Sequence, residues 1–154
     1  MRTTATALAV TALLGLTACG ADQDDSAAAE EARADAAAAA TGGPATGELS
    51  EWKVAMNRKT AEAGEVTFWI ANKGTMEHEF LVVRTDYPDG EIPLDGDHFS
   101  EDAAGVTVVD EIPEFEVGLI KELKIELAPG AYQLLCNIPN HYKNGMHVAF
   151  TVTA

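Results

Sequence analysis

Two stretches near the C-terminus alternate strictly between apolar and polar positions. Leu123, Ile125 and Leu127 alternate with charged residues, and residues 147–153 alternate in the same way between branched or aromatic side chains and small or polar ones. A period of two residues places every second side chain on the same face of a β-strand. The pattern therefore predicts two strands that each bury one face, over residues 120–127 and 147–153.

Residues 65–72 and 78–85 are instead apolar on both faces. In the second of these stretches, Phe80 to Val83 offer four large apolar side chains in succession. A strand of this kind needs cover on both sides. We therefore expect both strands at the centre of a sheet or beneath other segments.

Seven short stretches in all are rich in β-branched and aromatic residues and are bounded by Gly, Pro, Asn or Asp, a composition typical of strands separated by turns. They are residues 52–57, 65–72, 78–85, 106–112, 120–127, 131–136 and 147–153. Short strands in this number predict an all-β sandwich or barrel of about seven to eight strands. Residues 48–154 are the only part of the chain able to hold a core, so we expect one domain there.

Residues 86–105 break this pattern. They contain two prolines, three glycines and seven acidic residues, and they show no sustained period. A long interval without a period is typical of a functional or mobile loop. We expect it to run over the surface of the domain.

Residues 1–18 have the form of a secretory signal, in which Arg2 precedes an apolar stretch. That stretch is too short and too interrupted for a stable membrane span. Leu16 to Cys19 resembles a bacterial lipobox, which predicts cleavage before Cys19 and attachment of a lipid to its thiol; an ordinary secreted protein is the alternative. Residues 19–47 are mostly Ala, Asp, Glu, Gly, Thr and Ser, and are expected to form a low-complexity acidic tether.

The charge of the domain limits its partners. Residues 48–154 carry 19 Asp and Glu against 8 Lys and Arg, a formal charge of −11, and the whole chain carries −15. Nucleic acid and anionic lipid are poor partners for such a surface. A cationic protein is the better candidate.

The clearest chemistry lies in residues 132–152. Cys136, His141 and Met146 are each separated by four residues, on a stretch rich in turn-forming Asn, Pro and Gly between two predicted strands. Each of these residue types alone is usually structural. Together on one bend, a thiolate, an imidazole and a thioether suit copper in a trigonal site with one long bond, provided that a second imidazole joins them. His78 is the candidate for that imidazole.

Cysteine usage supports a chemical role for Cys136. The chain has two cysteines, and one alternative is a Cys19–Cys136 disulfide in an oxidising compartment. Such a bond would tie the tether to the end of a strand and would stabilise little. If Cys19 carries a lipid, Cys136 is an unpaired thiol in an exported protein, and such a thiol normally has a chemical task.

This ligand pattern resembles the cupredoxins, the small blue-copper proteins. Their C-terminal ligand loop carries Cys, His and Met; the spacing of Cys136, His141 and Met146 is similar to that of the rusticyanin and auracyanin members, and His78 matches the first ligand by position. The resemblance covers residues 48–154. It implies a Greek-key β-sandwich with one copper ion, Cu(I) or Cu(II), per chain, and it implies that His141 lies at the surface within an apolar rim as the electron port.

Glu79 departs from the family pattern, because many cupredoxins have Asn directly after the first ligand. We expect the backbone N–H of Glu79 to reach the sulfur of Cys136. We expect Asn137 to replace the missing Asn by tying its own loop to the Glu79 segment. Metal ligands need outer partners of this kind to orient them.

Together these features predict a monomeric one-electron carrier, exported and held at the outer face of a bacterial membrane through its lipid anchor alone, with a cationic redox protein as partner. A copper storage or delivery protein of the cell envelope is the alternative, since the same ligands would hold metal for handover. An enzyme is not expected. Copper enzymes need several further histidines, often in His-X-His pairs, and this chain has four histidines and no such pair.

Overall fold

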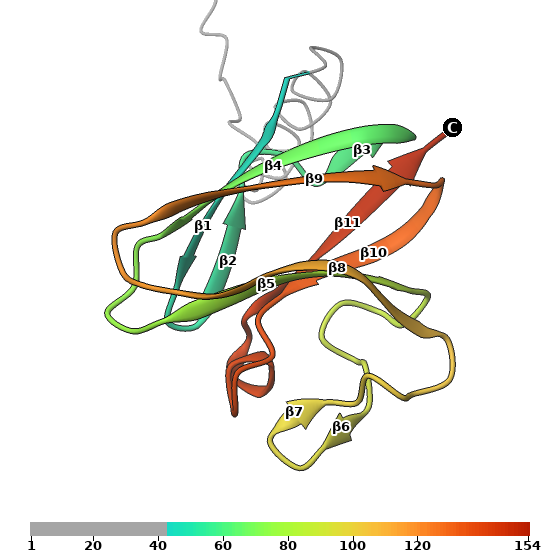
Figure 1. Ribbon diagram of the computed structural model, residues 1–154. Coiled ribbons are helices and arrows are strands. Elements are labelled where there is room, and N and C mark those ends of the chain that lie inside the picture. Colours follow the sequence, from blue (N-terminus) through green and yellow to red (C-terminus); the bar gives the residue numbers. More distant parts are fainter. Residues whose placement is uncertain (1–42) are drawn as a thin grey trace, which may run out of the picture.

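Two β-sheets, of four and five strands, face one another across a shared core, and a short two-stranded hairpin projects from one end (Figure 1). The structure is a computed structural model that describes residues 43–154; the predicted signal, Cys19 and the tether up to residue 42 lie outside the described residues. The predicted all-β sandwich is confirmed. The predicted number of strands was too low, because residues 43–154 form eleven strands.

The strands are β1 (Ala45–Ser50), β2 (Lys53–Met56), β3 (Thr60–Glu62), β4 (Gly64–Asn72), β5 (His78–Thr85), β6 (Leu94–Asp95), β7 (His98–Phe99), β8 (Val106–Phe115), β9 (Ile120–Leu127), β10 (Gly130–Leu135) and β11 (His147–Thr153). A 3-10 helix, η1 (Tyr142–Asn144), lies between β10 and β11. One sheet has the strand order β2-β1-β4-β9, the other has the order β3-β11-β10-β5-β8, and β6 pairs with β7. Within the described range, no helix is long and apolar enough to cross a membrane.

The predicted bounds of β5, β9 and β11 agree with the structure, since each has a clear apolar pattern. The strands that the sequence did not predict are β1, β3, β6 and β7. The first of them shows why: Ala45–Ser50 is poor in β-branched residues, and it becomes a strand by pairing in parallel with β4, with Ala45 opposite Phe68. The domain therefore includes residues 45–47, which composition alone had grouped with the tether.

Three phenylalanines join the two sheets. Phe68 of β4 packs against Phe80 of β5 and Phe150 of β11, with ring centroids 5.5 and 5.6 Å apart. All three side chains are almost completely buried. Burying one such side chain contributes roughly 1.5–3 kcal/mol, and tilted or edge-to-face ring pairs add to that. This cluster holds β5, which carries His78 at its first residue, against the other sheet.

The segment between β5 and β8 covers the second face of β5. Its residues Ile92 and Phe99 are buried in a separate apolar cluster with Leu81 and Val83 of β5 and with Tyr142 of η1. The expectation of a loop that only runs over the surface was therefore incomplete. Two apolar residues of the acidic segment provide the cover that the doubly apolar pattern of β5 requires.

Candidate metal centre

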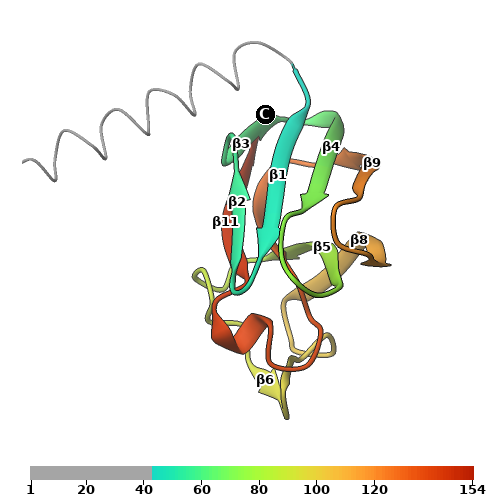
Figure 2. The same cartoon turned by 90° about the vertical axis from the view of Figure 1, so that its left-hand side faces the viewer.

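Strand pairing brings the predicted ligands to one end of the sandwich. Cys136 directly follows β10, and β10 pairs with β5 on one side and β11 on the other, so Leu135 lies opposite Leu81 and His147. The ligand loop, residues 136–146, then joins β10 to β11. Figure 2 shows this loop, with η1, at the same end as β6 and as the turn between β1 and β2. His78, at the start of β5, reaches the same place from the other side.

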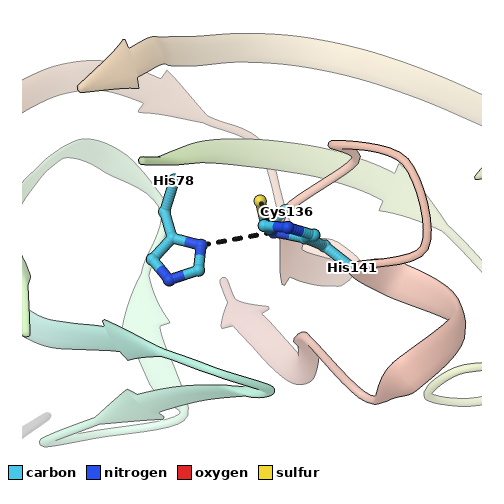
Figure 3. Close-up of side chains that lie close together, drawn as sticks. All are labelled: His78, Cys136 and His141. Carbon is cyan, nitrogen blue, oxygen red and sulfur yellow. Dashed lines mark hydrogen bonds between the residues drawn. The ribbon is translucent and has the colours of Figure 1, made fainter. Parts of the chain in front are cut away.

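Three ligand atoms converge there (Figure 3). The Nδ1 atoms of His78 and His141 are 3.2 Å apart, and the Cys136 sulfur is 3.2 Å from His141 Nδ1. All three atoms lie within 4.8 Å of one another, and in residues 43–154 they are the only group of three or more His, Cys, Asp or Glu side chains able to hold a metal ion. The side chains of His78 and Cys136 are 0% exposed and His141 is 3% exposed.

The chemistry of this donor set fits copper. Burial lowers the pKa of His78 and of His141, which favours the neutral imidazole that binds metals. Burial also raises the pKa of the Cys136 thiol to about 11, so the thiolate forms only when a cation stabilises it, as a bound metal does. Two neutral imidazoles and one thiolate are the ligands of a trigonal copper site.

Met146 closes the loop beside these residues. Its backbone carbonyl accepts a hydrogen bond from the Cys136 N–H at 3.0 Å, and its own N–H donates to the carbonyl of His141 at 3.1 Å. The side chain is fully buried in the same apolar cluster as Cys136. Met146 therefore lies at the end of the core where the ligands converge, and its backbone is hydrogen-bonded to two of the ligand residues.

The loop keeps its shape through local hydrogen bonds. The His141 N–H donates to the carbonyl of Ile138 at 2.8 Å, and the Gly145 N–H donates to that of Tyr142 at 3.0 Å. Gly145 has φ of 109°, a left-handed conformation that glycine adopts without strain. Tyr142 anchors the loop, because its hydroxyl accepts a hydrogen bond from the Ile92 N–H at 3.0 Å. The loop is thus tied to the segment between β5 and β8.

The two predicted outer partners, Glu79 and Asn137, have different roles. The backbones of Glu79 and Ile138 lower the pKa of the Cys136 thiol and so offset part of the rise that burial causes. The Glu79 carboxylate accepts a bond from the Asn137 N–H at 2.7 Å, so the link between the two segments uses the backbone of Asn137.

The Asn137 side chain is directed elsewhere. Its Oδ1 accepts a hydrogen bond from the Phe99 N–H at 2.7 Å, and its Nδ2 donates to the Glu101 carboxylate at 3.2 Å. The Asn137 carbonyl also lies 2.6 Å from Nδ1 of His98. Asn137 therefore fixes the acidic segment onto the ligand loop.

Two neighbours of the site were missed by the sequence analysis, and both come from the turn between β1 and β2. Trp52 packs edge-on against the His141 ring, with centroids 5.0 Å apart, and Glu51 lies beside His78. Trp52 is 41% exposed while His141 is 3% exposed. The expectation that His141 itself lies at the surface is therefore wrong. No local sequence pattern could have identified Glu51 and Trp52, because they reach the site only through the place of their turn in the fold.

Solved structures of other proteins share the fold of this domain. No protein-family model and no curated protein sequence matches the chain. The solved structure of reduced auracyanin from the photosynthetic bacterium Roseiflexus castenholzii is similar over 71% of this chain and 97% of that chain, with 22% identity and a TM-score of 0.52. Rusticyanin from Thiobacillus ferrooxidans is similar over 71% of this chain and 75% of its own, with 18% identity and a TM-score of 0.50. The described domain has the cupredoxin fold.

Proposed function

We propose that this protein is a one-electron carrier that binds one copper ion, with His78, Cys136 and His141 as strong ligands and Met146 as a weak fourth ligand. The observation that carries the proposal is the convergence of two imidazole nitrogens and one thiol within 4.8 Å in a buried place. When bound, copper supplies a reversible one-electron change between Cu(I) and Cu(II), and this set of ligands suits both states.

The chain holds the ligands in position without help from the metal. Backbone pairing of β10 with β5 and β11 fixes Cys136 relative to His78, and the hydrogen bonds of the loop fix His141. Close packing leaves these side chains little freedom to move. Electron transfer then requires little rearrangement of the protein, which favours a carrier.

The backbone N–H groups of Glu79 and Ile138 support negative charge on the Cys136 sulfur. Hydrogen bonds to a ligating sulfur are one of the means by which a protein adjusts a reduction potential. The burial of the whole site also excludes water from the ligands. These two features give the chain control over the reduction potential.

Trp52 provides the contact with a partner. Its ring touches His141 and is itself exposed, so an electron can pass between the ligand and a docked protein through this aromatic contact. The formal charge of −11 favours a cationic redox protein as that partner, because opposite charges steer encounter. We propose that the carrier is a monomer.

The N-terminal sequence supports a proposal for the location. Residues 1–18 read as a signal, and we propose that a lipid on Cys19 holds the protein at the outer face of a bacterial membrane. Without a lipid, a polar tether has no apolar surface to hold it at a bilayer. Changing Cys19→Ser should release the protein from membranes in its host, whereas continued membrane association would contradict the anchor.

Copper delivery and catalysis fit the site less well. Handover of copper needs a ligand that another protein can reach, and the three convergent side chains are buried. Catalysis at copper commonly uses additional histidines, and the two others of this chain, His98 and His147, bond instead to the Asn137 carbonyl and to Asp89. We therefore propose a carrier rather than an enzyme.

The absorption spectrum of the copper-loaded domain tests the proposal. Titration of the metal-free protein with Cu(II) should give an intense visible band at one equivalent, because a thiolate ligand transfers charge to Cu(II). The variant Cys136→Ser should fold and should lack the band. Rapid, reversible reduction with a cationic partner would support a carrier, whereas slow reduction with fast copper loss to a chelator would support delivery. A colourless Cu(II) form of the unchanged sequence would exclude the proposed site.

A further inference from the structure

A carboxylate lies beside His78 on the side of the ring that faces away from the other ligands. Oε1 of Glu51 is 3.3 Å from Nε2 of His78, whereas Nδ1 of the same ring faces His141. The His78 side chain is completely buried and that of Glu51 is 21% exposed. The contact is close but lies outside hydrogen-bond geometry, and within residues 43–154 His78 Nε2 has no hydrogen-bond partner. A buried N–H therefore has one acceptor within reach.

The Glu51 carboxylate is held in this place by the turn that precedes His78. The same Oε1 atom accepts hydrogen bonds from the backbone N–H groups of Thr75, at 2.8 Å, and Met76, at 3.1 Å. A glutamate carboxyl is ordinarily ionised at neutral pH, and these two N–H groups hold it in one position. The position of this charge is thus set by the backbone and does not depend on a flexible surface side chain.

Gly74 shows how closely the turn covers this contact. A Cβ atom at Gly74 would lie 2.6 Å from Oε1 of Glu51 and 2.7 Å from Nε2 of His78. Both distances are shorter than real Cβ contacts, so no larger residue fits without moving one of the two groups. The backbone at Gly74 therefore lies directly against both the carboxylate and the imidazole.

We propose that Glu51 is a positioning residue for His78. The Glu51 carboxylate accepts the Nε2–H of His78, orients the ring and strengthens Nδ1 as a donor to the bound metal. Outer carboxylates act in this way on metal-binding histidines in other proteins. A fixed negative charge close to a ligand stabilises the more positive state of a metal, since the Coulomb energy falls with distance and is large where water is excluded. Glu51 therefore lowers the reduction potential of the site. The inference rests on the proposed function.

The variant Glu51→Gln separates charge from geometry. The amide oxygen of Gln can still accept the bonds from Thr75 and Met76, while the negative charge is lost. We expect a higher reduction potential, an unchanged visible band and, in the metal-free protein, a melting temperature near that of the unchanged sequence. The matched control is Glu48→Gln, which removes the same charge from an exposed position on β1. It should shift the potential much less.

A redox-inactive probe gives a second measurement. With Zn(II) alone as the metal, Glu51→Gln should bind about tenfold more weakly than the unchanged domain, the lower end of the range for such outer partners, whereas Glu48→Gln should bind as the unchanged domain does. Glu51→Asp keeps the charge but loosens the bonds to the turn, and its potential should stay closer to that of the unchanged protein than the potential of Glu51→Gln.

Several outcomes would overturn the inference. Equal shifts of the reduction potential in Glu51→Gln and Glu48→Gln would mean that Glu51 acts only as one of many surface charges. A shift in Glu51→Asp as large as in Glu51→Gln would assign the effect to the turn and not to the charge. If the unchanged protein forms no coloured copper site, the proposed function fails, and the Zn(II) affinities still decide the role of Glu51. Unchanged Zn(II) affinity in Glu51→Gln would then refute it.

Discussion

Trp52 and His141 meet edge to face, with ring centroids 5.0 Å apart and an angle of 73° between the rings. Trp52 is 41% exposed, and His141 beneath it is 3% exposed. The tryptophan belongs to the turn between β1 and β2, and the histidine belongs to the loop between β10 and β11. A residue from the opposite sheet therefore separates the candidate ligand from solvent, and any molecule that approaches the site from this side meets Trp52 first.

Removal of this ring should open the site. In Trp52→Ala the His141 ring becomes accessible, so a soluble Cu(I) chelator should remove copper severalfold faster. The rate is measured by stopped-flow absorption. The matched control is Trp69→Ala, because Trp69 is also 41% exposed but lies on β4, away from the ligand loop. Equal release rates in the two variants would mean that Trp52 does not limit access.

Replacement of Met146 should change the potential without removing the colour. Met146→Gln replaces a thioether with an amide oxygen, which favours Cu(II) over Cu(I), so the reduction potential should fall. Met146→Leu, a swap of similar volume that costs less than about 1.5 kcal/mol in a core, should raise it because no donor remains. Redox titration followed by absorption gives both values. An unchanged potential in both variants would exclude Met146 as a ligand.

The Asn137 side chain should matter for stability more than for colour. In Asn137→Ala the buried Phe99 N–H loses its acceptor, which should cost about 1–3 kcal/mol in the free energy of unfolding. Amide exchange at Phe99 should become faster. The control is Asn57→Ala, which removes a similar bond to the exposed Thr46 N–H, where water can replace it. Equal losses from the two variants in denaturant titrations would contradict the anchoring role of Asn137.

The acidic segment should steer cationic partners, because it lies against the ligand loop. The Asn140 N–H donates to the Asp97 carbonyl at 2.7 Å, and Lys143 pairs with the Asp97 carboxylate at 3.4 Å. Asp95→Asn should therefore slow electron exchange with a cationic complex and reduce its salt dependence, since charges interact over about 8 Å at physiological ionic strength. Glu62→Gln, at the opposite end of the sandwich, is the control, and stopped-flow rates across a salt series make the measurement. A slope that neither variant changes would exclude steering by this segment.

The local sequence determined the central strands and the ligand loop. The apolar pattern of β5, β9 and β11 is a property of each strand alone. Strands β9 and β11 alternate with a period of two residues because one face is buried, and β5 is a continuous apolar run because both faces are buried. Cys136, His141 and Met146 were likewise evident, because one short turn-rich loop between two strands carries all three. His78 was the candidate for the second imidazole, and its position matched the first ligand of the family that the ligand loop resembles.

Tertiary structure decided what surrounds that loop. Strand β1 exists because β4 pairs with it, and residues Ile92 and Phe99 of an otherwise polar segment become core because β5 needs cover. The contacts of Glu51 with His78 and of Trp52 with His141 arise where one sheet brings its turn to the end of the other. Such contacts join residues far apart in the chain, and neither propensity nor periodicity records them, because both describe only the immediate neighbours of a residue.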